Sequence, residues 1–428
     1  MDKKRPRIFY GWWVVGACFL IALYVSGIIF YGFTAIFEPI ADEFGWSYTQ
    51  ISLAASLRGL EIGLLAPLLG LLVDRWGPRR LIFIGSIIIG LGLILLSRTT
   101  SLGMFYGAFI LVTIGVSTCS GTVLMTAVAN WFRRKVGLAT GIMTCGWGFS
   151  GLLVPLVVRL IDIFEWRMTM VILGLGVVVI GMPLSLLVRH KPEQYGYQPD
   201  GEMNSSTISD EGLTPAPTAE VDIGAKQALK SSTFWHIVLA LTCYSLILNA
   251  VVTHVMPYLK SIGITRTMSG LVASAIPLLS ISGRLGFGWL GDKLDKRWVA
   301  AGAFAAMGLG SLCFGYASSD GTWLLVPFLV LFGIGYGGNS TMRATLLQEY
   351  FGRSKFGAIF GFAMGIMMLG QAIGAPLAGW VFDTWGSYQG IWLVFAGLAA
   401  IALVLVATTP RPHPSPMKGQ LKGTTPID

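Results

Sequence analysis

Residues 114–137 read IGVSTCSGTVLMTAVANWFRRKVG, and residues 334–357 read IGYGGNSTMRATLLQEYFGRSKFG. Both stretches combine an Ile-Gly pair, a largely apolar run and a basic loop that ends in glycine. A second pair of similar loops occurs at residues 73–80 (VDRWGPRR) and 291–297 (GDKLDKR), at a comparable offset of about 219 positions. Such a repeat indicates a tandem duplication. In membrane carriers, duplicated halves rock around a site that lies between them.

The composition is that of a membrane protein. The chain has 428 residues, of which 54% are hydrophobic and 12% charged, about half the charged fraction of a soluble domain. A helix of about 20 apolar residues crosses a hydrocarbon core of ~30 Å. The apolar runs lack the two-residue alternation of a β-barrel, which leaves helices to pair the backbone groups in lipid. We expect twelve transmembrane helices near residues 9–36, 48–72, 80–98, 104–131, 136–162, 167–189, 234–259, 267–290, 298–318, 322–349, 356–383 and 387–409.

The predicted fold class is an all-α membrane protein with twelve transmembrane helices in two pseudo-symmetric six-helix bundles. We expect the first bundle to occupy residues 1–190 and the second to occupy residues 233–410. Residues 191–232, which are rich in Pro, Gly and Ser, are predicted to be a cytoplasmic linker. Residues 411–428 are predicted to be a cytoplasmic tail.

The net charge of +9 comes from basic clusters in alternate loops. They precede the first predicted helix and follow the second and fourth, and the second half repeats the pattern. The loop after the first helix is instead acidic. By the positive-inside rule, both termini are cytoplasmic in a multi-pass protein of the plasma (inner) membrane. The basic charge is therefore expected to face a lipid bilayer and not a nucleic acid.

Several classes of function lack the residues they need. The sequence has no nucleotide-binding loop, so no ATPase is implied. Its cysteines have no metal-ligand spacing, and we expect neither a metal nor another cofactor. None of the four histidines has a sequence neighbour that would favour an enzyme. The sequence favours a carrier that works as a monomer.

Residues 70–80 (GLLVDRWGPRR) resemble the signature loop of the major facilitator superfamily, and residues 288–297 preserve part of it. Residues 131–141 (WFRRKVGLATG) are similar to the helix 5 motif of the monocarboxylate transporters and the related oxalate:formate antiporters. Residues 10–13 (YGWW) are similar to the helix 1 motif, without the acidic residue that often precedes its glycine. Arg284 is similar to the helix 8 arginine that binds substrate carboxylate in this family. The resemblance implies secondary transport of a carboxylate by alternating access.

Three features depart from the family pattern. Ser280 stands where mammalian-type members have an aspartate one turn before the arginine. The first predicted helix has no charged residue, whereas those members have a lysine there. The coupling of protons to substrate is therefore open. Gln371 occupies the position of a lysine found in the oxalate-type members, which disfavours a dicarboxylate.

Arg284 is the main candidate for substrate binding. It lies eight residues before Asp292, hence ~12 Å inside the cytoplasmic edge of its helix. A guanidinium at that depth is unfavourable by ~3 kcal/mol or more unless it has a partner, and no acidic residue lies within one turn. An interhelical ion pair would satisfy it. We favour an anion site, because the planar fork of arginine matches a carboxylate.

Three further ionisable residues are candidates for proton coupling or an outer gate. Arg58 and Glu61 share one face of the second helix, ~24 and ~20 Å from the cytoplasmic edge when counted from Asp74. They form either a self-neutralising pair or a site at which Glu61 takes up a proton, since a low dielectric favours a neutral carboxyl group. His254 is either a packed residue or a group that titrates near neutral pH.

The remaining candidates fall into two groups. Asp74, Asp292 and Arg343 lie near cytoplasmic helix ends and are predicted to latch an inner gate, with Arg343 reaching Asp292 or Glu349. Polar and aromatic residues at mid-depth are candidate substrate contacts beside Arg284; they are Ser280, Tyr336, Asn339, Cys119, Trp147 and Gln371.

The sequence thus favours a proton-coupled secondary carrier for small organic monocarboxylates such as lactate, pyruvate or formate. The alternatives are anion exchange without a proton and efflux of a larger amphiphilic compound, which the abundant Met and aromatic residues would suit.

Overall fold

The computed structural model describes residues 9–119, 121–132, 135–190, 192–195, 225–318, 321–351 and 356–410. In this part of the chain all regular structure is helical. The first half contains α1 (Tyr10–Val25), the π-helical turn η1 (Ser26–Tyr31), α2 (Phe33–Phe44), α3 (Tyr48–Trp76), α4 (Pro78–Ser97), α5 (Leu102–Thr118), α6 (Gly121–Ala129), α7 (Val136–Phe149), η2 (Ser150–Leu152) and α8 (Leu153–Leu187). The second half contains α10 (Ser232–Ser261), α11 (Arg266–Lys293), α12 (Lys296–Gly315), η5 (Thr322–Leu324), α13 (Leu325–Phe351), α14 (Phe356–Trp385) and α15 (Gln389–Ala407). Two short helices lie between the halves, η3 (Pro192–Tyr195) and α9 (Ala225–Lys230).

These helices are long and apolar enough to cross a membrane. Ten helical stretches qualify in the described part of the chain. One of them, residues 137–187, holds two crossings, because the helix axis reverses within α8 at Glu165 (φ 61°, ψ 165°). The 29-residue α3 adds another, which brings the total to the predicted twelve. The first crossing is longer than predicted, because α1, η1 and α2 continue to Phe44.

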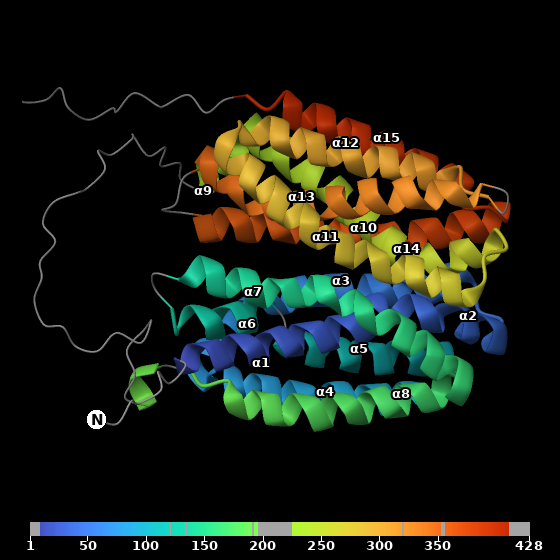
Figure 1. Ribbon diagram of the computed structural model, residues 1–428, viewed down its shortest axis with the longest axis horizontal. Helices are drawn as coiled ribbons and strands as arrows, with labels where there is room; N and C mark the ends of the chain where they lie inside the picture. The colour runs from blue at the N-terminus through green and yellow to red at the C-terminus, as the bar shows by residue number, and fades with distance from the viewer. Residues whose placement is uncertain are drawn as a thin grey trace, which may run out of the picture.

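The helices form two bundles that lie side by side, with α1 to α8 in one and α10 to α15 in the other (Figure 1). The internal repeat is visible in the packing. In the first half α4 packs against α5 and α8, and in the second half the corresponding α12 packs against α13 and α15. Large apolar side chains cover the outside, including Leu71, Val179 and Val326, which are 70%, 69% and 64% exposed. Such a surface suits a hydrocarbon environment.

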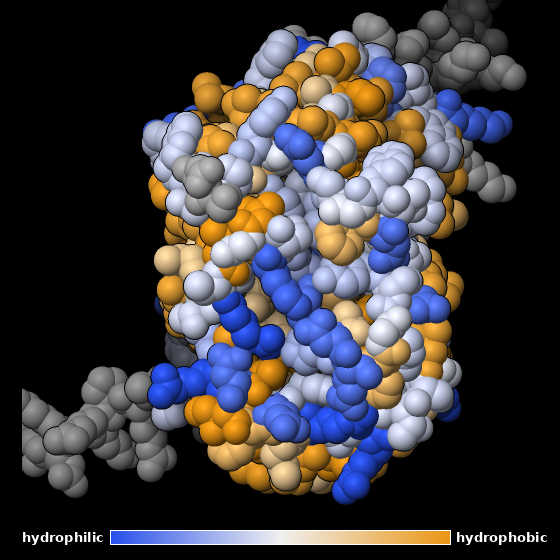
Figure 2. Space-filling view, turned by 90° about the vertical axis from the view of Figure 1, so that its right-hand side faces the viewer, coloured by the Kyte–Doolittle hydropathy of each residue, from blue (hydrophilic) through white to orange (hydrophobic). Residues whose placement is uncertain are grey.

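Contacts between the bundles are concentrated at one end of the molecule. We call the end at which α1 begins the open end, and the end at which α2 finishes the closed end. At the closed end α3 packs against α14, and α10 contacts α2. Figure 2 looks onto the closed end and shows hydrophilic residues across its face, with hydrophobic residues around the periphery.

The predicted linker and tail fall mostly outside the described residues. Of residues 191–232, the structure describes residues 192–195 and 225–232, which include α9. Residues 411–428 lie outside it entirely. The domain boundaries that the sequence indicates remain a prediction.

Candidate functional site

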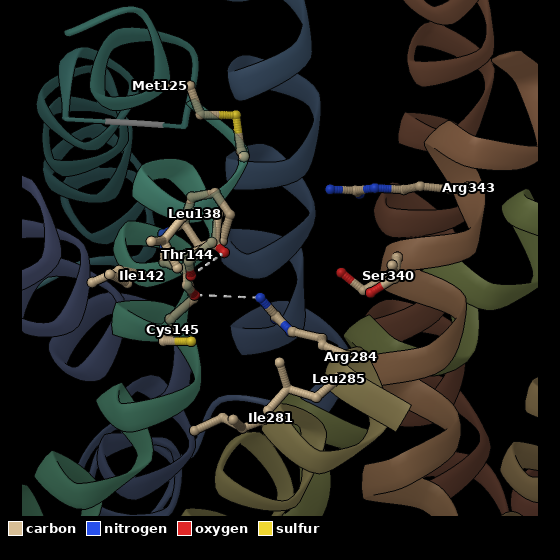
Figure 3. Close-up of a pocket in the computed structure, with 14 residues that line it drawn as sticks. Met125, Leu138, Ile142, Thr144, Cys145, Ile281, Arg284, Leu285, Ser340 and Arg343 are labelled. Carbon is tan, nitrogen blue, oxygen red and sulfur yellow. Dashed lines mark hydrogen bonds between the residues drawn. The ribbon is translucent and has the colours of Figure 1, made fainter. Parts of the chain in front are cut away.

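A cavity of about 530 Å³ lies between the two bundles, toward the open end (Figure 3). Its wall on the side of the first bundle is largely apolar and comes from α6 and α7; it includes Met125, Leu138, Ile142, Cys145 and Trp147. Its wall on the side of the second bundle comes from α11 and α13 and carries Arg284, Ser340 and Arg343. Cavities of about 210 and 180 Å³ adjoin it, since Trp147 lines all three. Among the described residues, no Asp or Glu lines these three cavities.

Arg284 projects from α11 across the cavity toward α7 (Figure 3). Its Nη1 donates to the carbonyl oxygen of Thr144 and its Nη2 to Oη of Tyr336, each at 3.4 Å. Its buried Nε has no hydrogen-bond partner. Both distances are long for hydrogen bonds that a charged group donates. The guanidinium therefore retains donor capacity, and it forms no ion pair within the described residues.

Close backbone contact between α11 and α13 places Arg284 beside Tyr336. A Cβ added at Gly283 would lie 2.2 Å from the carbonyl oxygen of Ile334, and one at Gly337 would lie 2.0 Å from that of Ser280. Only glycine permits this approach. The glycines around Tyr336 thus fix the spacing of the two helices that carry the cationic wall.

Tyr336 connects the two bundles at the base of the cavity. Its Oη lies 2.8 Å from Oη of Tyr31, which belongs to η1 in the first bundle. The ring of Tyr244 is stacked on that of Tyr336 at a centroid distance of 6.3 Å. Tyr336 was predicted as a substrate contact, whereas no sequence pattern singles out Tyr31 or Tyr244. A π-helical turn, which often marks a functional site, is not recognisable in the sequence SGIIFY.

Three other predicted contacts line the same space. Trp147 lines all three cavities, Gln371 of α14 lines the 210 Å³ cavity, and Cys119 lines the 180 Å³ cavity. Cys119 is 4% exposed, and its Sγ lies 3.9 Å from the carbonyl oxygen of Ile82. The cysteine is a packed wall residue, while Trp147 and Gln371 are better placed to meet a bound molecule.

Ser280 and Asn339, in contrast, belong to none of these cavity walls. The hydroxyl of Ser280 donates to the carbonyl oxygen of Pro277 on its own helix at 2.6 Å, and the residue faces α13. Nδ2 of Asn339 donates to the carbonyl oxygen of Gly335 at 3.0 Å. Each is close in sequence to a cavity residue, but each lies on the buried face of its helix. Neither touches the cavity that Arg284 enters.

Arg58 occupies the deepest part of the site. It lines the 180 Å³ cavity, and its Nη1 donates to the carbonyl oxygen of Ile29 at 2.8 Å. Its Nη2 reaches Oδ1 of Asn249 in the second bundle at 3.4 Å, and its guanidinium carbon lies 4.3 Å from the ring centroid of Phe30. Arg58 is therefore held by both bundles.

Glu61 does not pair with Arg58, contrary to the simplest expectation for two charges three residues apart. Its carboxyl group instead contacts the hydroxyl of Thr113 on α5, and its Oε1 is buried without a partner. The Thr113 hydroxyl also lies 2.9 Å from the carbonyl oxygen of Ile110. A hydroxyl has one proton for these two acceptors, and a protonated Glu61 that donates to Thr113 satisfies both contacts.

His254 is fully buried at the closed end. Its Nδ1 lies 2.9 Å from Oη of Tyr388, and its Nε2 lies 2.9 Å from both the carbonyl oxygen of Ala375 and Oγ of Ser52. Because a carbonyl oxygen only accepts, the proton belongs on Nε2, and Tyr388 donates to Nδ1. Ser52 is in the first bundle, so His254 holds the bundles together at this end.

Asp383 joins the bundles through three hydrogen bonds. From the end of α14 its carboxylate accepts hydrogen bonds from the backbone N–H groups of Tyr48 and Thr49 at 2.9 and 2.8 Å, and from Oγ1 of Thr49 at 2.5 Å. These groups form the N-terminus of α3, which attracts negative charge. A Cβ at Gly379 would lie 2.8 Å from this backbone, so the two helices touch directly.

Ion pairs surround this contact. Lys260 of α10 pairs with Glu38 and, at 3.2 Å, with Asp42 of α2. Arg266 of α11 pairs with Asp162 of α8 at 3.0 Å. Together with Asp383 and His254, these residues form what we call the closed-end seal. Of these residues only His254 was a candidate from the sequence, because pairs that join two bundles carry no local signal.

Of the inner-gate candidates, Arg343 and Asp292 form no latch with each other among the described residues. Arg343 lies in the cavity wall and contacts neither Asp292 nor Glu349; Glu349 pairs instead with Lys296 at 2.7 Å. Asp292 is exposed. The side chain of Asp74 lies outside the described residues. The three residues belong to the same bundle, and Arg343 reaches neither carboxylate because its side chain is directed into the cavity.

The family of the chain follows from its sequence and fold. The model of the Major Facilitator Superfamily matches residues 19–286 and 255–427. The chain belongs to this superfamily, and it is a secondary transporter of the membrane rather than an enzyme. The resemblance stated from the motifs is thereby confirmed, as is the predicted fold class.

Curated relatives resemble the chain over almost its whole length. Monocarboxylate transporter 12-B of Danio rerio is 26% identical over 427 residues, which cover 95% of this chain and 89% of that protein. Monocarboxylate transporter 13 of Bos taurus is 23% identical, with 95% and 91% covered. The uncharacterized MFS-type transporter YcxA of Bacillus subtilis is 24% identical, with 93% and 95% covered.

Solved structures share the fold. The crystal structure of a bacterial homologue of the human lysosomal transporter Spinster, in an inward-facing and occupied conformation, superposes with a TM-score of 0.63. The two sequences are 14% identical, and 95% of each chain is covered. At this identity the likeness establishes the fold of the twelve helices.

Proposed function

We propose that this transporter carries small organic monocarboxylates, such as lactate, pyruvate or formate, by alternating access and in symport with protons. It does so as a monomer in the plasma (inner) membrane, with both termini in the cytoplasm. With this topology the open end faces the cytoplasm, and the structure corresponds to the inward-open state. The closed-end seal then lies on the outer face.

The observation that carries this proposal is Arg284 in its cavity. Its guanidinium lies between the bundles, has an unpartnered Nε, and meets no carboxylate from the described wall residues. A cation in a low-dielectric cavity attracts an anion, and the fork of arginine matches a carboxylate. Two relatives at 23–26% identity are named monocarboxylate transporters, which supports the same substrate class.

The proposal is tested with a panel of labelled carboxylates in proteoliposomes that carry an imposed pH gradient. Saturable uptake of pyruvate or lactate, driven by an acidic exterior, is the expected result. Uptake of none of the short carboxylates by a correctly folded protein would contradict the proposal. The panel includes a longer apolar carboxylate such as octanoate, because the apolar wall formed by Met125, Leu138 and Ile142 also suits a larger amphiphile.

For the proton, we propose Glu61 as the coupling group. Its contact with Thr113 is satisfied by the protonated carboxyl form, which is the form a symporter loads. His254 is the second candidate, although both its ring nitrogens form hydrogen bonds within the closed-end seal. The substrate carboxylate itself could share the proton.

Uptake is expected to rise as the external pH falls. In Glu61→Gln this rise in uptake rate should be about tenfold smaller across the pH range over which a carboxyl group titrates. Exchange of internal for external substrate should persist, because reorientation of the loaded carrier needs no net proton movement. Initial rates of net uptake and of exchange are measured side by side. Unchanged pH dependence in both Glu61→Gln and His254→Gln would exclude these groups and favour anion exchange.

A further inference from the structure

Arg343 shares the cavity with Arg284, and the sequence alone had assigned it to a gate. It lines both the 530 and the 210 Å³ cavities. Figure 3 shows its side chain extending from α13 into the same space that Arg284 enters from α11. Tyr336, Ser340 and Arg343 follow one another at helical spacing on a single face of α13, and all three face this space.

Arg343 lies closer to the open end than Arg284. Gly337 of α13 is level with Arg284 of α11, since a Cβ at Gly337 would lie 2.7 Å from the backbone nitrogen of Arg284. Arg343 follows Gly337 by six residues in the direction of the open end, which corresponds to ~9 Å along the helix. In Figure 3 its side chain lies at a height between Met125 and Leu138, farther toward Met125 than Arg284 does.

The charge of Arg343 has no counterpart among the described residues. No described Asp or Glu lines either cavity, and Arg343 forms no ion pair with a described residue. The neighbouring Glu349 is paired with Lys296 at 2.7 Å. Two arginines outside the cavity differ from Arg343, because Arg167 pairs with Glu43 and Arg266 with Asp162. Two like charges that face one cavity without a carboxylate produce a positive potential that concentrates anions.

We propose that Arg343 is a second, weaker carboxylate subsite at the mouth of the cavity, which we call the mouth subsite. It binds the substrate carboxylate arriving from the open side, and the carboxylate then moves inward to Arg284. This inference rests on the proposed function, since it requires a carboxylate substrate. Arg343 acts in the mouth subsite through its positive charge alone. Arg284 binds through its charge and through two parallel hydrogen bonds from its planar guanidinium.

The mouth subsite works from one side only. When the open end closes and the other end opens, substrate from the opposite side reaches Arg284 without passing Arg343. A gate latch would behave differently, because a latch sets the balance between the two states and therefore alters KM from both sides. Sidedness distinguishes the two roles.

The test uses inside-out and right-side-out membrane vesicles with labelled pyruvate and lactate as probes. For entry from the open side, Arg343→Gln is expected to raise KM roughly tenfold, with Vmax little changed and a weaker dependence on ionic strength. Arg343→Lys keeps the charge and should remain within about twofold of the wild type. For entry from the opposite side, KM of both variants should match that of the wild type, whereas Vmax of Arg343→Gln should fall, because Vmax/KM of a carrier must change by the same factor in both directions.

Three results would overturn the mouth subsite. The first is an equal rise in KM from both sides in Arg343→Gln, which identifies a latch. The second is a loss in Arg343→Lys as large as that in Arg343→Gln, and the third is an unchanged KM in both variants. Absence of saturable transport of either probe by the wild type would overturn the proposed function, and this inference with it.

Discussion

Transport of pyruvate or lactate is expected to fall by about 100-fold when Arg284 is replaced by lysine, and further when it is replaced by alanine. Lysine keeps the positive charge, but it cannot donate two parallel hydrogen bonds to one carboxylate. It would also lose one of the contacts that now fix the side chain between Thr144 and Tyr336. The loss should therefore fall mainly on binding, and KM should rise.

The matched control is Arg98→Lys. Arg98 is exposed at the end of α4 and remote from the cavity, so the same substitution should leave transport unchanged. Initial uptake rates in proteoliposomes give KM and Vmax for each variant, and thermal unfolding confirms that each is folded. Normal transport by a folded Arg284→Lys or Arg284→Ala would show that Arg284 does not anchor the substrate.

A second large effect is expected from Asp383→Asn. This substitution should lower the population of the state described here about tenfold. The carboxylate accepts three hydrogen bonds at the N-terminus of α3, and each hydrogen bond to a charged group contributes ~1.5–3 kcal/mol. An amide has one acceptor oxygen, and its NH₂ group would face the backbone donors. The closed-end seal should open, and the cavity mouth should close.

A native thiol reports this shift. Cys145 lines the cavity toward the open end and is accessible when the mouth is open. Its rate of alkylation by a maleimide, measured by mass spectrometry of the peptide that contains it, should fall about tenfold in Asp383→Asn if the populations shift as expected. Because Cys18 and Cys119 are buried, their labelling serves as an internal check on unfolding.

Asp42→Asn is the matched control for Asp383→Asn. Asp42 lies at the same end and pairs with Lys260 at 3.2 Å, but its side chain is 70% exposed. Exposed ion pairs contribute little to stability, so alkylation of Cys145 should stay near the wild-type rate. Equal rates in the wild type, Asp383→Asn and Asp42→Asn would show that Asp383 does not hold the closed end together.

The fold was largely predictable because a helix that crosses lipid must be apolar and of a certain length. Apolar runs of the right length mark each crossing, and the offset repeat marks two similar bundles. Element ends were less predictable. Residues 137–187 form one continuous helical stretch in which Glu165 reverses the direction, and no Gly or Pro marks that turn.

Depth along the membrane could also be predicted, whereas the orientation of each side chain could not. Counting residues placed Arg284 well inside the membrane, and the structure puts it in the cavity wall. The same counting placed Arg343 near a helix end, from which a gate role was inferred, yet its side chain enters the cavity. Ser280 lies one turn from Arg284, but it faces α13 because glycine draws the two helices together.

Contacts between the bundles were not predictable from one sequence. The hydrogen bond between Tyr31 and Tyr336 joins residues 305 positions apart, and Asp383 meets α3 over more than 330 positions. Such pairs depend on how the two bundles dock, which local patterns do not specify. The docking of the bundles also changes during transport, so that one state shows only some of the contacts between them.

The most direct test of the substrate class is a competition assay against pyruvate exchange. Proteoliposomes loaded with unlabelled pyruvate should accumulate labelled pyruvate, and external lactate should inhibit this accumulation. Lactamide, which has the same shape without the negative charge, should not inhibit it, because Arg284 selects a carboxylate. Equal inhibition by lactate and lactamide, or no accumulation of pyruvate at all, would contradict a carboxylate carrier built around Arg284.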